Sequence, residues 1–178
     1  FNLLQQVGKN QGFQVVNMHT FAIDAMRVSS TRIRDALREG DLSVAEKLLG
    51  RPYRMSGRVA HGDKRGRKMG YPTANIHLHR AKVPLNGVYA VQLYGIDEEP
   101  VNGVANIGVR PTISGSDKAL LEVHLFDFQR DIYGEHVQVY FLKKLRDEQK
   151  FASLEKLIEQ IHFDSAQAKD YFESHIEL

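Results

Sequence analysis

From Val28 to Leu49, apolar residues recur at the three- and four-residue spacing of an amphipathic helix. The apolar positions are Ile33, Leu37, Val44, Leu48 and Leu49. Gly40 and Asp41 interrupt this pattern, so we expect two helices here. Ser29, Ser30 and Thr31 each offer a side-chain cap for the first of them.

The Arg51-Pro52 step should end the helical region, because the residue before a proline is pushed out of the helical conformation. We therefore expect a domain boundary that separates residues 1–50 from residues 51–178. Within the first part, one short strand is expected around Phe13 to Val16.

Beyond the boundary, short β-type runs are separated by glycine-rich or polar turns. The runs are Gly57 to Ala60, Gly87 to Tyr94, Gly103 to Gly108, Leu120 to Phe126 and Val137 to Phe141. This spacing indicates an antiparallel barrel or sandwich. Helical periodicity returns from Ser153 to Tyr171, with an apolar face formed by Leu154, Leu157, Ile158 and Ile161.

Composition narrows the possible functions. The chain has 178 residues and no cysteine, which excludes disulfides, thiolate metal sites and a cysteine nucleophile, and makes the cytoplasm the default location. The formal charge is only +2, so we expect neither nucleic acid nor membrane as a partner. No apolar stretch approaches the ~18 residues of a membrane span. We expect a monomer or a weak oligomer.

A glycine-rich, basic segment begins at Gly57 and is typical of a backbone that approaches polyphosphate. Its glycines are Gly57, Gly62, Gly66 and Gly70, with basic residues that include Arg67 and with His61 placed to contact phosphate. The segment lacks the Lys-Ser/Thr step of a Walker A loop. From composition alone, a solvated hairpin turn explains it equally well.

The segment runs into Pro72-Thr73-Ala74-Asn75, where a hydroxyl and an amide oxygen fall on one side of an extended stretch. Neutral oxygens of this kind suit Mg²⁺, which usually also bridges nucleotide phosphates. A simple Asn/Thr turn is the alternative for this stretch. In the later run, alternation places Glu122 and His124 opposite Leu121 and Val123, where Glu122 is either a general base or a solvent-facing glutamate.

Together these strings resemble the riboflavin kinase family, in which a glycine-rich stretch leads into Pro-Thr-Ala-Asn. The resemblance continues through Gly87-Val88-Tyr89-Ala90, Gly103 to Thr112, Glu122-Val123-His124 and Tyr133-Gly134-Glu135. It implies a mainly β fold, a six-stranded antiparallel Greek-key barrel with a C-terminal helix. It also implies transfer of the ATP γ-phosphate to riboflavin, giving FMN.

The resemblance also assigns roles to particular residues. It makes Glu122 the general base and places Thr73 and Asn75 on Mg²⁺, with Tyr71 and Pro72 beside ATP. It implies flavin contacts from Asn106, Arg110, Arg146 and Phe151. For Arg146 and Phe151, a salt bridge at the helix entry with a core anchor is the alternative that needs no ligand.

The segment Ser29-Ser30-Thr31-Arg32-Ile33-Arg34 combines hydroxyls and arginines at a helix start, where backbone N–H groups favour anions. It resembles a motif near the end of the FMN adenylyltransferase module of bifunctional bacterial FAD synthetases. Residues 1–50 would then be a remnant of an α/β nucleotidyltransferase domain. The His-x-Gly-His motif of that module is absent from this sequence, so we expect no adenylylation.

Two rival functions remain open. One is a module that binds flavin or nucleotide without moving phosphate. The other is a small barrel that binds single-stranded nucleic acid, with Tyr71, Tyr89 and Tyr94 as stacking surfaces.

Overall fold

The computed structural model describes residues 1–16, 21–24, 26–62, 66, 70–78, 83–110 and 118–175. Its helices are α1 (Asn2–Gln11), α2 (Ser30–Glu39), α3 (Leu42–Leu49) and α5 (Leu154–Ser174). The strands are β1 (Ala22–Ile23), β2 (Met26–Arg27), β3 (Arg54–Ala60), β4 (Ala74–His77), β5 (Gly87–Tyr94), β6 (Val101–Arg110), β7 (Lys118–Leu125) and β8 (His136–Arg146).

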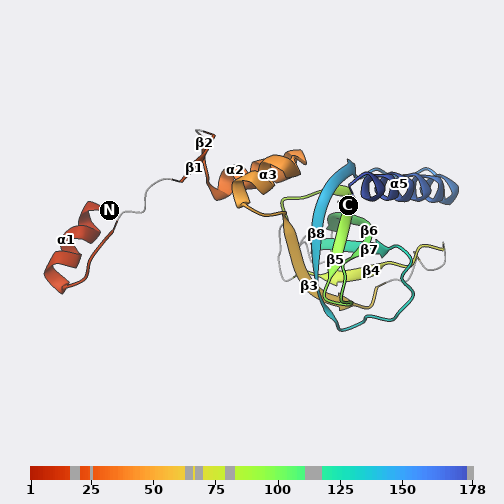
Figure 1. Cartoon of the computed structure of the whole chain (residues 1–178), viewed down its shortest axis with the longest axis horizontal. Helices are drawn as coiled ribbons and strands as arrows, with labels where there is room; N and C mark the ends of the chain where they lie inside the picture. The colour runs from red at the N-terminus through yellow and green to blue at the C-terminus, as the bar shows by residue number, and fades with distance from the viewer. Residues whose placement is uncertain are drawn as a thin grey trace.

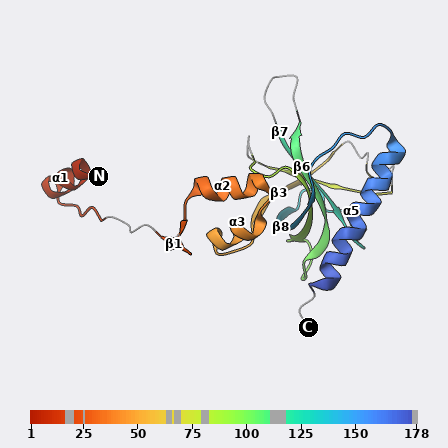
Figure 2. The same cartoon turned by 90° about the horizontal axis from the view of Figure 1, so that it is seen from above.

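Six antiparallel strands close into a barrel in the order β3-β4-β7-β6-β5-β8. Three consecutive strands, β5 to β7, pair as neighbours, and β8 returns to lie beside β5, which is a Greek-key arrangement. The expected six-stranded barrel is therefore confirmed, and the sandwich is excluded. In the views of Figures 1 and 2, α5 runs along the outside of the barrel.

Alternating apolar residues of the strands fill the barrel interior. On β7, Leu121 and Val123 are fully buried, as the alternation predicted, while Glu122 and His124 face outward. Tyr89 and Phe141 meet edge to face inside the barrel, with ring centroids 5.4 Å apart. Because Tyr89 is completely buried, it offers no surface for stacking a base, which weakens the nucleic-acid alternative.

The two helices expected before the barrel are present. The Ser29 hydroxyl accepts from the backbone N–H of Arg32 and caps α2, and the Asp41 carboxylate caps α3 in the same way. Gly40 ends α2 with a left-handed φ of 79°, a conformation that favours glycine. Figure 1 shows this helical hairpin between α1 and the barrel.

The hairpin shares its core with the barrel. Leu37 and Ala45 are buried in the same apolar cluster as Met55 and Phe141 of the strands. The Lys144 side chain of β8 also packs directly over Gly40.

Two expectations for the ends of the chain were wrong in part, and one strand of the barrel was missed. Residues 13–16 form no strand, and α1 precedes them instead. Strand β4 was not expected as a separate element. Helix α5 is capped by Ser153 as expected, but Leu154 is 55% exposed and does not belong to its packed face. Among the described residues, no helix is long and apolar enough to cross a membrane.

Candidate active site

A row of outward-facing side chains crosses most of the barrel. Asn75 of β4 pairs with Glu122 of β7, Glu122 pairs with Asn106 of β6, Asn106 pairs with Val88 of β5, and Val88 pairs with Arg146 of β8. Residues directly opposite each other in an antiparallel ladder project from the same face of the sheet. The strand register therefore brings side chains together that are up to 71 positions apart in sequence, counted from Asn75 to Arg146.

This row forms the floor of a cavity of about 360 Å³ between the barrel and α5. That volume suits a small molecule. Leu157, Ile161, Asp164 and Ser165 of α5 form the opposite wall. The remaining lining residues are Gly66, Tyr71, Thr73, Val104, Leu120, His124, Glu148, Gln149 and Phe151.

Helix α5 is held over this face by a small apolar cluster of its own. Ala168 of α5 is fully buried against Ala90 and Phe126, and Tyr171 and Phe172 pack around them. The outer surface of the barrel is thus apolar where the helix touches it and polar where the cavity opens.

Thr73 and Asn75 both line this cavity, as their positions on one side of an extended segment suggested. Two described glycines of the preceding segment, Gly62 and Gly66, approach this stretch closely. A Cβ on Gly62 would lie 2.1 Å from the Asn75 side-chain nitrogen, and one on Gly66 would lie 2.2 Å from the Tyr71 carbonyl oxygen. Glycine at these two positions therefore allows the loop to approach the residues at 71–75.

The other loop residues occupy different surroundings. Gly57 is buried within β3, where a Cβ would lie 2.5 Å from the His77 carbonyl oxygen, so packing between β3 and β4 accounts for this glycine. His61 stacks on Tyr133 with ring centroids 3.8 Å apart. Gly70 has a φ of 84° just before Tyr71. Arg67 lies outside the described residues.

Tyr71 and Pro72 join the loop to the rest of the site. The Tyr71 hydroxyl hydrogen-bonds Nδ1 of His162 on α5, and its ring meets the His124 ring edge to face at 5.1 Å. Burial raises the pKa of the Tyr71 phenol, which keeps it protonated. Nδ1 of His124 lies 2.9 Å from the Pro72 carbonyl oxygen, which can only accept, so the ring N–H donates.

A second cavity, of about 270 Å³, lies on the other side of the Pro72–Ala74 segment. It is lined by Val59, Pro72, Thr73, Ala74, Val123, Leu125 and residues 128–133. Thr73 lines both cavities, so this residue lies between the two spaces. His61 stacks on Tyr133 of the second cavity, which associates that histidine with this space.

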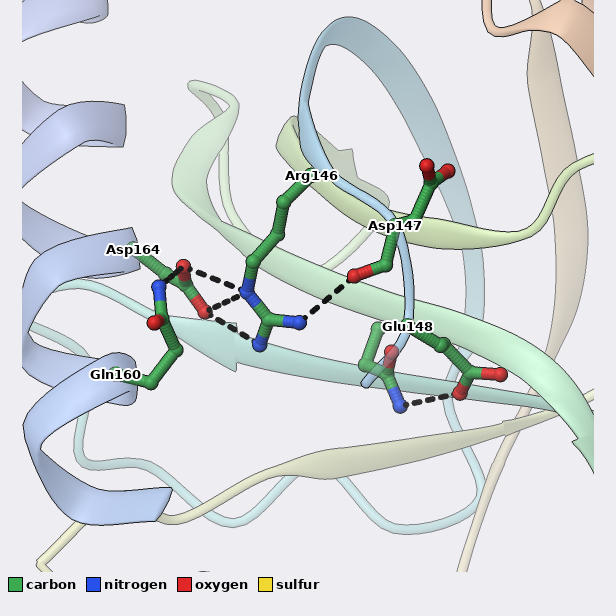
Figure 3. A network of polar contacts seen from close by, with 6 residues as sticks. Arg146, Asp147, Glu148, Gln160 and Asp164 are labelled. Atoms are coloured by element: carbon green, nitrogen blue, oxygen red, sulfur yellow. Dashed lines mark hydrogen bonds and ion pairs between the residues drawn. The ribbon is translucent and has the colours of Figure 1, made fainter. Parts of the chain in front are cut away.

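At the other end of the row, Arg146 forms a salt bridge with Asp164 of α5 (Figure 3). The guanidinium also lies over the Phe151 ring, 5.6 Å from its centroid. Arg146 therefore does form a salt bridge, but its partner lies in the middle of α5 and not at the helix entry, and both Arg146 and Phe151 line the cavity as well. The Asn106 side-chain nitrogen donates to Glu148 at 3.3 Å. For Arg110, only the backbone in β6 is described.

The arginine-rich start of α2 is organised by its own contacts. Arg34 folds back so that its Nε donates to the Ser30 carbonyl oxygen at 2.9 Å and its Nη2 to the Ser30 hydroxyl at 3.3 Å. Thr31 and Arg32 are exposed. These contacts are those of a capped helix. They do not test whether residues 29–34 derive from an adenylyltransferase module.

The described residues contain no group of three or more His, Asp or Glu side chains that could hold a metal ion. A protein cage of carboxylates is therefore absent from this part of the chain. The oxygens of Thr73 and Asn75 fit a magnesium ion that takes its other ligands from phosphate and water.

Sequence reasoning placed His124 on the strand face of Glu122 without giving it a role, and it gave no role to Glu148 or Asp164. Asp164 carried a usable signal, because it stands between Ile161 and Ala168 on the packed face of α5, where an apolar residue is the norm. His124 also carried one, because it alternates with the buried residues of β7 on the same face as Glu122. Glu148 lies in the irregular segment after β8, where the sequence has no periodicity from which the direction of a side chain could be predicted.

Together the fold and this site define a small Greek-key barrel with a cavity of small-molecule size between its outer surface and its C-terminal helix. Residues 49–172 match the Flavokinase family, the riboflavin kinases. The chain therefore belongs to the riboflavin kinase family.

The bifunctional riboflavin kinase/FMN adenylyltransferase of Escherichia coli strain K12 is 49% identical over 172 residues, which cover 97% of this chain and 55% of that protein. The chain thus spans about half the length of the curated relatives it matches.

Two crystal structures share the fold. One, described as a macrolide-efflux protein from Streptococcus pneumoniae, has a TM-score of 0.73 and 38% identity, covering 90% of this chain and 52% of that one. Riboflavin kinase from Trypanosoma brucei has a TM-score of 0.51 and 25% identity, covering 70% of this chain and 82% of that one.

Proposed function

We propose that this chain transfers the terminal phosphate of ATP to the 5′-hydroxyl of riboflavin and so produces FMN. The observation that carries the proposal is the meeting of Thr73, Asn75 and Glu122 in one cavity on a riboflavin kinase barrel. A hydroxyl and an amide oxygen can hold the magnesium ion that neutralises phosphate charge, and a carboxylate can accept the proton of the attacking alcohol.

The two cavities suggest how the substrates are arranged. We place ATP in the smaller cavity beside Pro72 and Tyr133, with the glycine-rich loop around its phosphates, and riboflavin in the larger one under α5. The terminal phosphate and the ribityl hydroxyl then meet at Thr73, which both cavities share. Holding the two reactants in line is the main contribution that a protein makes to this reaction.

Glu122 is the proposed general base. Its carboxylate accepts the proton of the 5′-hydroxyl while that oxygen bonds to the γ-phosphorus, and the bond to the ADP oxygen breaks. Thr73 and Asn75 would hold a magnesium ion that neutralises charge on the phosphates. At the far end of the row, Arg146, Phe151 and Asn106 are proposed to contact the flavin ring, and we extend this proposal to Arg110.

Residues 1–50 are proposed to be the C-terminal remnant of an FMN adenylyltransferase domain, and residues 51–178 the kinase domain. The kinase family match begins at residue 49, which supports the boundary, and the two activities named for the E. coli relative support an adenylyltransferase origin of the residues before it. In that part of the chain, Ser29, Ser30, Thr31, Arg32 and Arg34 would belong to the nucleotide site of such a domain. We expect no conversion of FMN to FAD by the present residues.

Product analysis tests the proposal directly. The purified chain is incubated with riboflavin, ATP and Mg²⁺, and riboflavin, FMN and FAD are then resolved by chromatography. We expect FMN without FAD, and no FMN when Mg²⁺ is chelated. Unchanged riboflavin in the presence of bound flavin or nucleotide would instead identify a binding module without transferase activity.

A further inference from the structure

Asp164 is a charged side chain inside an otherwise apolar contact. It is only 3% exposed, and it stands one turn after Ile161 and one turn before the fully buried Ala168. Removing a carboxylate from water is unfavourable unless hydrogen bonds and an opposite charge compensate. The contacts of Asp164 must therefore explain its presence.

Both carboxylate oxygens of Asp164 accept hydrogen bonds (Figure 3). Arg146 Nε donates to Oδ1 at 2.9 Å and to Oδ2 at 3.0 Å, and Arg146 Nη2 donates to Oδ2 at 2.8 Å. Gln160, one turn earlier on α5, donates to Oδ1 at 2.9 Å. This is the fork-to-fork geometry that fixes a guanidinium plane in one orientation.

A buried ion pair of this kind adds little net stability over an apolar pair of similar size, because desolvation offsets the attraction. The distinctive effect of this ion pair is on the orientation of the Arg146 guanidinium. One edge of the Arg146 guanidinium faces Asp164, Nη1 donates to the Asp147 carbonyl oxygen at 2.9 Å, and the plane lies over Phe151. Asp164 thus sets the plane and the rotation of this side chain.

An orientated Arg146 retains hydrogen-bonding capacity toward the cavity. A guanidinium carries five N–H groups, and the contacts to Asp164 and Asp147 employ one on each of its three nitrogens. Two N–H groups on the terminal nitrogens are left for a ligand. Arg146 and Asp164 both line the cavity, at the end of the row opposite to Asn75.

The same pair also joins two walls of the cavity. Arg146 ends β8 and begins the segment that supplies Glu148, Gln149 and Phe151 to the lining. Asp164 belongs to α5, which supplies the facing wall. The distance between these walls therefore depends on the contact between Arg146 and Asp164.

We propose that Asp164 is a positioning residue for the non-reacting end of the substrate. It holds Arg146 so that two N–H groups face the carbonyl oxygens of a planar heterocycle that lies in the cavity beside the Arg146–Asp164 pair. The inference rests on the proposed riboflavin kinase function for the identity of that heterocycle. Asp164 itself touches no reacting atom.

The first test is Asp164→Asn, which keeps the size of the side chain and removes its charge. We expect the KM for riboflavin to rise at least about tenfold, as for the loss of one charge-assisted hydrogen bond, and the KM for ATP to stay within about twofold. Glu159→Gln is the matched control, because it removes the same charge from α5 at an exposed pair with Lys156 and should change neither KM. An equal rise in both KM values for Asp164→Asn would overturn the proposal.

A double variant, Arg146→Met with Asp164→Leu, separates positioning from packing. Removing both buried charges should restore the thermal stability that Asp164→Asn loses. We expect the KM for riboflavin to remain high in this variant despite the restored stability. Recovery of the wild-type KM would show that the pair only supports the fold, and the positioning role would be wrong.

Riboflavin binding, followed by quenching of flavin fluorescence, keeps this test distinct from that of the proposed function. If the wild-type chain binds riboflavin but forms no FMN, the kinase proposal fails. In that case we still expect Asp164→Asn to raise the dissociation constant for riboflavin about tenfold. A wild-type chain that binds no riboflavin would contradict both proposals.

Discussion

Glu122 on β7 lies directly opposite Asn75 on β4 in the barrel ladder, and opposite Asn106 of β6 on its other side. The carboxylate therefore stands between two amides on one face of the sheet. Backbone hydrogen bonds of three strands fix this arrangement, so the candidate base and one candidate magnesium ligand are held in place by the barrel itself.

Replacing Glu122 by Gln should reduce turnover strongly. Glutamine keeps the size and the hydrogen-bonding ability of the side chain but does not accept a proton from the substrate hydroxyl. We expect kcat for FMN formation to fall about 10²- to 10⁴-fold, with riboflavin affinity by fluorescence titration nearly unchanged. Glu98→Gln, at an exposed site in the β5–β6 connection, is the control. Full turnover by Glu122→Gln would remove the assignment of the base.

The hydroxyl of Thr73 is expected to matter more than its methyl group. Thr73 is shared by the two cavities. Thr73→Val replaces its hydroxyl with a methyl group of similar size, whereas Thr73→Ser keeps the hydroxyl and removes the methyl group. We expect the Mg²⁺ concentration for half-maximal rate to rise about tenfold in the valine variant and little in the serine variant. The measurement is a magnesium titration of initial rates at saturating ATP. Identical titrations for the two variants would contradict a magnesium contact from this hydroxyl.

We expect Gly57 to contribute to the stability of the barrel and not to ATP binding. A methyl group there would lie 2.5 Å from the His77 carbonyl oxygen and 2.7 Å from a methyl group of Ile76. Gly57→Ala should therefore lower the free energy of unfolding by about 1–3 kcal/mol, as overpacking usually does, without a specific rise in the KM for ATP. Ser56→Ala, at the adjacent exposed position, should change stability by less than about 0.5 kcal/mol. A normal melting temperature with weakened ATP binding would instead favour a nucleotide contact.

Because Tyr89 is buried in the core, we expect the free energy of unfolding to fall at alkaline pH. Burial raises the pKa of Tyr89 to about 12, and the negative charge of nearby Asp147 acts in the same direction. The folded state therefore retains this proton at a pH where the unfolded state releases it. The stabilisation is complete below pH ~10 and is lost between pH ~10 and 12, at up to about 1.4 kcal/mol per pH unit.

Urea titrations of the wild type and Tyr89→Phe across this range test that expectation. At neutral pH the variant should be less stable by about 1 kcal/mol, because the hydrogen bond to Asn86 is lost. The difference between the two proteins should shrink as the pH rises from 10 to 12. A constant difference would mean that Tyr89 does not titrate in this range in either state.

Local pattern was sufficient for much of the fold, because helices and long strands have periods that a sequence displays. Gly87 to Tyr94 was expected as a strand with the bounds that β5 has, and Gly40 and Asp41 do separate two helices. Strand β4 was missed because it is only four residues long and depends on pairing with β3 and β7. Helix α1 was missed as well.

The composition of the site could be inferred from motifs, but its geometry could not. Which residue lies opposite Glu122 depends on strand order and register, and both are set by contacts between distant segments. The pairing of Arg146 with Asp164 likewise depends on where α5 packs on the barrel. For Arg146, a ligand contact and a salt bridge were alternatives in the sequence, whereas the structure makes the salt bridge part of the cavity wall.

The apolar cluster that joins α2 and α3 to the barrel also limits how the two halves of such a protein can be exchanged. Leu37, Ala45 and Met55 occupy one continuous core, although the family match begins only at residue 49. A kinase transplanted from Pro52 onward would expose that end of its barrel to water. Recombination that preserves folding should therefore cross over before Ser29, so that the helical hairpin is inherited with the barrel.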